Sequence, residues 1–138
     1  MKFFLPIFFF VFFSINSLEA IDFRQKIEIV LKKDQKKKIV VKYEDKEKLF
    51  DFRWTLYKNG GLVIHRVYDK IVGQNVLYLR DKNQSFRVEL KTRDGDFYNL
   101  PYILVKFKEF KQESKEAVFE LFLWDKKEDI FLEELKES

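Results

Sequence analysis

Residues 49–68 read LFDFRWTLYKNGGLVIHRVY, and this stretch decides the fold class. Ahead of Asn59-Gly60, large apolar residues alternate with smaller or polar ones. The residues that share the apolar face are Phe50, Phe52, Trp54 and Leu56. Alternation with period two is typical of a strand with one buried face, and Asn-Gly favours the type I′ turn of a two-residue hairpin. We therefore expect an antiparallel hairpin whose Trp54 face lies in the core.

The register of this hairpin decides the surroundings of His65, the single histidine of the chain. A two-residue loop pairs Trp54 with His65 and buries the imidazole beside the indole. A three-residue loop, which Gly61 permits, pairs Trp54 with Arg66 and turns His65 outward beside Thr55. A shift of one residue inverts the two faces of a strand. Both registers remain open at this point.

The same alternation recurs along the rest of the chain. The expected strands cover residues 23–32, 39–43, 49–56, 62–68, 76–80, 86–91, 102–110 and 117–124. We expect residues 76–80 and 86–91 to form a hairpin around Asp81–Gln84. Short strands at regular spacing indicate an all-β fold, either a single antiparallel β-sandwich or a small up-and-down barrel of about eight strands. Residues 21–124 would form this one domain.

The two ends of the chain differ from the β domain. Residues 1–20 combine a charged start, an apolar run and a polar end, which is typical of a secretory signal peptide. We expect cleavage after Ala20 and a periplasmic or secreted protein; an uncleaved N-terminal anchor is the alternative. The apolar run is too short to span a membrane, and the mature chain has no other candidate. Residues 125–138 form an acidic amphipathic tail, expected as a short helix or an extra strand at residues 130–132.

Catalytic and metal sites find little support in the sequence. The chain has one His and no Cys, whereas a zinc site needs several such ligands. A general base such as His65 also needs an orienting group and a nucleophile, and no motif supplies them. Paired carboxylates could support a hydrolase, but with 23 acidic residues some pair always fits. We expect no enzymatic activity and no metal or cofactor.

Two surface features suggest binding. A basic patch lies in the turn after the first strand, at Lys32, Lys33, Lys36, Lys37 and Lys38. It suits an anionic envelope surface, and export argues against nucleic acid as the partner. The last two expected strands are apolar on both faces, so one face is either covered by Phe131 and Leu135 of the tail or docks a partner.

We therefore expect a small exported interaction module that binds another cell-envelope protein, as an accessory of a larger assembly. Its expected partner-binding residues are Tyr102, Leu104, Phe110, Val118, Phe122 and Trp124, with Phe122 and Trp124 as the energetic centre. The alternative is a carrier that encloses an apolar ligand in a barrel, with a pocket lined by Phe50, Phe52 and Trp54. A hydrolase is the third hypothesis.

Overall fold

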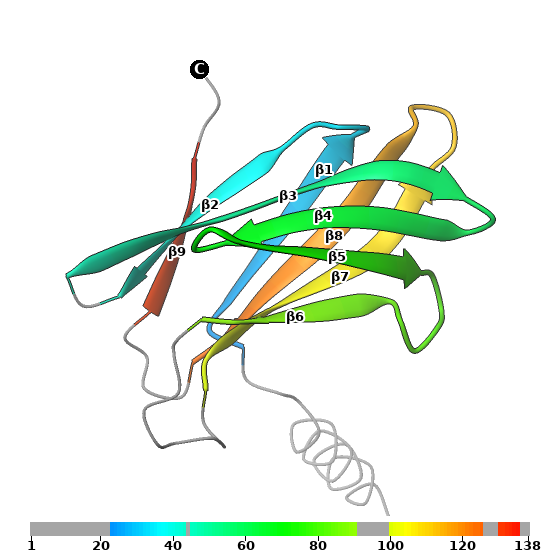
Figure 1. The fold of residues 1–138 in the computed structure, drawn as a ribbon. Helices are drawn as coiled ribbons and strands as arrows, with labels where there is room; N and C mark the ends of the chain where they lie inside the picture. Colours follow the sequence, from blue (N-terminus) through cyan, green and yellow to red (C-terminus); the bar gives the residue numbers. More distant parts are fainter. Residues whose placement is uncertain (1–22, 44, 91–99, 126–129, 136–138) are drawn as a thin grey trace, which may run out of the picture.

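The computed structural model describes residues 23–43, 45–90, 100–125 and 130–135 (Figure 1). The expected signal peptide therefore lies outside the described residues, as do parts of the acidic tail. The strands are β1 (Gln25–Lys32), β2 (Lys37–Tyr43), β3 (Lys46–Lys58), β4 (Gly61–Tyr68), β5 (Ile71–Tyr78), β6 (Ser85–Glu89), β7 (Tyr102–Lys111), β8 (Glu116–Trp124) and β9 (Ile130–Glu134).

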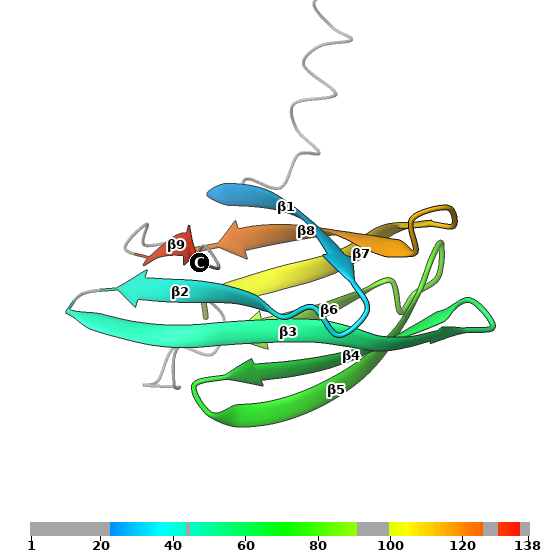
Figure 2. The same cartoon turned by 90° about the horizontal axis from the view of Figure 1, so that it is seen from above.

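These strands form two antiparallel sheets that pack face to face as a β-sandwich (Figures 1 and 2). The four-stranded sheet has the order β1-β8-β7-β6, and the five-stranded sheet has the order β5-β4-β3-β2-β9. The expected all-β class is confirmed. Of the two alternatives for the tail, residues 130–134 adopt the extra strand, which pairs with β2. None of the described residues belongs to a helix that could cross a membrane.

The expected hairpin between residues 76–80 and 86–91 is wrong. β5 begins at Ile71 and pairs with β4, whereas β6 pairs with β7 in the other sheet. Asp69 and Lys70 cause the difference, because both adopt positive φ, 49° and 70°, in a tight two-residue turn. Such turns usually contain Asn or Gly, so this one has no clear sequence signal. Residues 79–84 therefore cross between the sheets.

The Asn59-Gly60 turn has the expected two-residue geometry, with φ of 54° and 79° and with Lys58 opposite Gly61. A bulge between Trp54 and Leu56 nevertheless shifts the ladder, so that Trp54 faces Ile64 and His65 faces Arg53. The two-residue register is therefore confirmed from the Lys58–Gly61 pair to the Leu56–Val63 pair and is wrong beyond the bulge, while the three-residue register is wrong throughout. An extra residue in one strand inverts the faces beyond it. Leu56 is consequently exposed rather than part of the core face.

Aromatic rings from both sheets meet in the core between them. Phe52 of β3 contacts Phe119 of β8 edge-on, with ring centroids 5.3 Å apart. Trp54 of β3 meets Phe110 of β7 in the same manner at 5.7 Å. Such edge-to-face pairs add to the free energy gained by burying the rings. The core thus aligns the two sheets and leaves their outer faces for other contacts.

Polar side chains connect the sheets at their margins. The Trp54 indole Nε1 donates a hydrogen bond of 2.8 Å to the carbonyl of Leu31. The Tyr68 hydroxyl donates one of 2.6 Å to the carbonyl of Leu90. The Gln25 amide bonds both backbone groups of Leu132, accepting from its N–H at 2.8 Å and donating to its carbonyl at 3.2 Å. Gln25 therefore joins β1 to β9, the edge strands of the two sheets on that side.

Candidate functional site

The outer face of the four-stranded sheet carries a cluster of large side chains that we call the aromatic face. Its members are Phe23, Tyr102, Leu104, Phe122 and Trp124. Pairing of β7 with β8 sets Tyr102 opposite Trp124 and Leu104 opposite Phe122. Each of the five side chains is partly exposed. Alternation along β7 and β8 explains this placement, because the intervening residues fill the core.

The rings of the aromatic face are ordered by stacking and by cations. Tyr102 and Trp124 stack with centroids 5.5 Å apart and planes 21° apart. The guanidinium carbon of Arg87, on β6, lies 3.8 Å from the Tyr102 centroid. Phe122 contacts Phe23 at 4.9 Å. Cation–π contacts of this kind hold a ring in one orientation, so a partner would meet a pre-ordered surface.

Charged pairs border the aromatic face on the side of β1. The Nζ of Lys26 lies 2.9 Å from the Oε2 of Glu120 and 5.7 Å from the centroid of the Phe122 ring. The hydrogen bond from Lys26, followed by the charges of neighbouring lysines, lowers the pKa of Glu120, although burial opposes that shift. The side chain of Glu120 is only 9% exposed, so its charge is held in place beside the rings. The border therefore carries an ion pair in which Lys26 is the exposed member and Glu120 the buried one.

Two of the six expected partner-binding residues are not accessible on the aromatic face. A bulge between Phe107 and Glu109 turns Phe110 toward the core, where its ring stacks on Tyr57 with centroids 4.0 Å apart. Val118 lies on the outer face opposite Val30 but is only 2% exposed. The expected site thus contracts to Tyr102, Leu104, Phe122 and Trp124, which the structure brings together.

Phe23 and Arg87 complete the site and were not expected there. Period-two alternation assigns Phe23 to the core side of the first strand, but the chain bends at Arg24 before β1 begins. Arg87 has no sequence signal beyond its outward position in β6. Its contact with Tyr102 depends on β6 pairing with β7, whereas the sequence predicted a hairpin with residues 76–80.

The tail does not cover the aromatic face with any of its described residues. β9 pairs with β2 in the five-stranded sheet, and this leaves Phe131 and Leu135 exposed on that side of the molecule. The tail therefore does not account for the second apolar face of β7 and β8.

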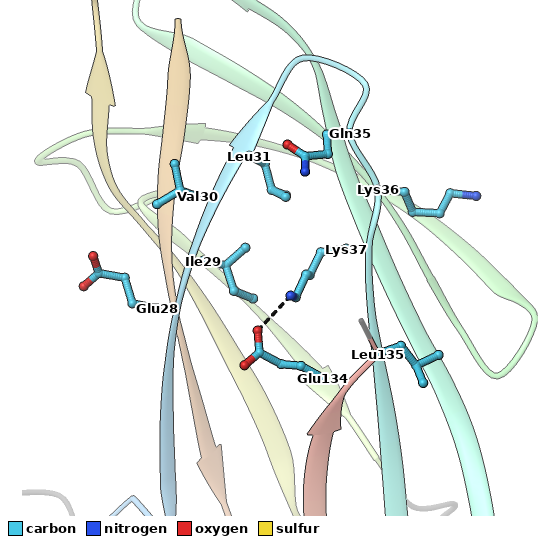
Figure 3. Close-up of a pocket in the computed structure, with 9 residues that line it drawn as sticks. All are labelled: Glu28, Ile29, Val30, Leu31, Gln35, Lys36, Lys37, Glu134 and Leu135. Carbon is cyan, nitrogen blue, oxygen red and sulfur yellow. Dashed lines mark ion pairs between the residues drawn. The ribbon is translucent and has the colours of Figure 1, made fainter. Parts of the chain in front are cut away.

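The basic patch meets the acidic tail. Lys37 forms an ion pair of 2.8 Å with Glu134 (Figure 3). Lys42, further along β2, pairs with Glu133. Lys32, Lys33, Lys36 and Lys38 remain exposed. A depression of about 270 Å³ surrounds the Lys37–Glu134 pair, between β1, β2 and the end of β9. Part of the positive charge expected to attract an anionic surface is thus neutralised within the molecule.

The residues proposed to line a carrier pocket belong to the packed core. Phe50 and Phe52 are fully buried and stack on each other at 5.6 Å. Trp54 is nearly as buried and donates its hydrogen bond to Leu31. None of the three lines the depression of Figure 3. Their positions give the carrier hypothesis no support.

His65 lies on the outer face of the five-stranded sheet between Arg53 and Gln74. Both neighbouring positions lack the carboxylate that usually orients a catalytic imidazole. Within the described ranges, His, Cys, Asp and Glu side chains nowhere gather in threes or more as a metal site would require. The aromatic face is accordingly the better candidate site.

The sequence and the fold were also compared with known proteins. No protein-family model matches this chain, and neither the curated proteins nor the solved structures yield a significant match.

Proposed function

We propose that this protein is a small exported interaction module that docks another protein of the cell envelope on its aromatic face. The observation that carries the proposal is the ordered cluster of Tyr102, Phe122 and Trp124 on an outer sheet face. Soluble domains seldom gather several large aromatic side chains on an outer face unless that face binds something.

The composition of the aromatic face favours a protein as its partner. Tyr, Trp, Phe and Arg are the residues enriched at the centre of protein interfaces, where a few of them provide most of the binding free energy. In this protein, the rotamers of Arg87, Tyr102 and Trp124 are already restricted because the three side chains stack on one another. Binding would therefore lose less side-chain entropy than it would with freely rotating side chains.

In-cell crosslinking combined with substitution tests this proposal. A photo-crosslinking residue in place of Leu104 is expected to capture one dominant envelope protein, and the same residue in place of Phe131 is not. Phe131 is the matched control because it is an exposed apolar residue of the other sheet. The double variant Phe122→Ala, Trp124→Ala is expected to reduce capture of that protein at least about tenfold, given the usual size of aromatic hot spots.

A second variant separates loss of binding from loss of folding. Arg87→Glu replaces the cation over Tyr102 with an anion on an exposed position, so the sheet should remain folded. It is expected to weaken capture as well. Unchanged capture by both variants, in proteins with unaltered circular dichroism, would place the partner elsewhere.

The proposed address is tested separately by N-terminal sequencing of the protein from fractionated cells. We expect residue Ile21 at the mature N-terminus and the protein in the envelope or the medium. A protein retained in the cytoplasm with residues 1–20 attached would refute export.

A further inference from the structure

The edge of β5 differs from the other sheet edges among the described strands. Free edges expose unpaired backbone N–H and C=O groups, and proteins usually protect them with charge, shortness or a covering group. β1 carries Lys26, Glu28 and Lys32. β6 and β9 have only five residues each, and Gln25 covers the backbone of β9 at Leu132. These three edges are protected.

Among the described residues, nothing protects β5 in this way from Ile71 to Leu77. It has eight residues, and the run from Ile71 to Leu79 contains no charged residue and no proline. Val72 is 74% exposed, and Ile71 is 71% exposed. In Figure 2 β5 forms the outermost strand of its sheet, with no described segment beyond it on that side. Because 36% of all residues in the chain are charged, a run of nine uncharged residues at a sheet edge is unusual for this sequence.

The backbone of β5 shows which groups point to the open edge. The two-residue turn at Asp69-Lys70 makes Tyr68 and Ile71 a hydrogen-bonded pair with β4, and such pairs alternate along an antiparallel ladder. Val72, Gln74 and Val76 therefore direct their N–H and C=O groups away from β4. Tyr78 has the same orientation, and its N–H donates to the carbonyl of Asn83 at 3.0 Å.

We propose that β5 pairs with the β5 of a second copy of this chain, in antiparallel orientation about a two-fold axis at Gln74. This register sets Gln74 opposite the second copy's Gln74 and Val72 opposite the second copy's Val76. It is the register that uses all three free residues, giving six backbone hydrogen bonds by the geometry of hydrogen-bonded pairs. The two five-stranded sheets would then form one continuous sheet.

The side chains of the outer face fit the same register. Leu56, Val63 and Val76 form an apolar row across β3, β4 and β5. The second copy's Val72 and Val67 would extend this row across the axis, since they also lie side by side. Apolar cross-strand pairs stabilise sheet pairing, and the neutral edge avoids repulsion between identical chains. A second copy therefore suits this edge in backbone, side chains and charge.

The proposal is independent of the docking role of the aromatic face, because β5 belongs to the other sheet. Its first test is the mass of the purified protein, expressed from residues 1–138, by light scattering over a range of concentrations. We expect a dimer that dissociates on dilution. A strict monomer at every concentration would overturn the proposal.

Charge at the axis provides the second test. Gln74→Lys and Gln74→Glu each place two like charges opposite each other, so each alone is expected to raise the dissociation constant at least about tenfold. An equimolar mixture of the two variants is expected to recover dimers, because every mixed pair combines opposite charges. Failure of the mixture to recover would exclude Gln74 as the axis.

Cysteine crosslinking distinguishes this dimer from unspecific association, since the natural chain has no Cys. Gln74→Cys is expected to form an intermolecular disulfide on mild oxidation, because opposed Cα atoms in a hydrogen-bonded pair lie about 5.5 Å apart. Arg53→Cys is the matched control on the same outer face. Its two copies would be separated by five strand spacings, about 24 Å, and should stay reduced. Equal crosslinking of both variants, or crosslinking of Gln74→Cys to a different protein in cells, would refute the two-fold dimer.

Discussion

The hydroxyl of Tyr68 gives the sharpest test of how the two sheets are joined. The side chain is 8% exposed and donates its hydrogen bond to the Leu90 carbonyl across the margin of the sandwich. Tyr68→Phe keeps the ring and leaves that buried carbonyl without its donor. An acceptor left unsatisfied in this way costs about 1–3 kcal/mol of the free energy of unfolding near neutral pH.

The effect should also depend on pH in one direction. Burial, reinforced by the negative charges of nearby groups, raises the pKa of Tyr68 well above its ordinary value near 10. Between the unfolded and the folded pKa, only the unfolded chain releases this proton. The contribution of Tyr68 is therefore fully present below about pH 10 and falls by about 1.4 kcal/mol per pH unit above it. Because Phe does not titrate, the difference between the natural protein and the variant should approach zero by about pH 11–12.

Urea unfolding of both proteins, followed by circular dichroism at a series of pH values, measures this difference. Tyr78→Phe is the matched control at neutral pH. That side chain is exposed, so water can occupy the place of the removed hydroxyl and no buried group is left without a partner. A neutral-pH loss below about 0.5 kcal/mol, the usual range for surface changes, would refute the buried hydrogen bond. A difference that stays constant through about pH 11 would refute the argument from burial.

Two further predictions concern the margin near β1. Gln25→Leu removes both bonds to Leu132 and is expected to lower the free energy of unfolding by about 1–3 kcal/mol in urea titrations, whereas Gln112→Leu in an exposed turn should change little. Glu120→Gln should cost less than about 1 kcal/mol at pH 7, since its partner Lys26 is mostly exposed. The Glu120 pKa is lowered in the folded state, so this loss should be full above the unfolded value near 4.3 and vanish as the pH falls through the folded pKa. A loss that does not decline as the pH is lowered from 7 through this acidic range would contradict the ion pair.

The extent to which the fold is predictable from sequence varies with the range of the interactions. Alternation in residues 50–54 and 117–124 assigns the buried rows correctly, because each depends only on the residues within one strand. The bulges after Trp54 and Phe107 are not visible in the pattern, since a single extra residue resembles ordinary alternation on either side of it. Each one misplaced a residue of the predicted faces, Leu56 in the first case and Phe110 in the second.

Pairing between strands was harder to predict than the strands themselves. Local turn chemistry identified the Asn59-Gly60 hairpin, but the Asp69-Lys70 turn adopts the same class of geometry without Asn or Gly. The pairing of β9 with β2 depends on residues far apart in the chain, and it decided both where the tail lies and what neutralises Lys37. Four residues of the aromatic face were predicted from their outward positions in the alternating pattern of β7 and β8. The contact of Arg87 with Tyr102 could not be predicted in this way, because it depends on the order of the strands.

The order of the strands also bears on when the domain can fold. β2 to β5 form a meander whose contacts are local, so they can associate as soon as they are synthesised. β1 can pair only after β8, its one neighbour in the sheet, has been synthesised. The hydrogen bonds between Gln25 and Leu132 join residues that are 107 positions apart in the sequence. Closing such a long loop costs chain entropy before the contacts that compensate for it have formed, and this slows folding. We therefore expect β1 to remain unpaired until nearly the whole chain is present, with the sandwich closing last where β1 meets β9.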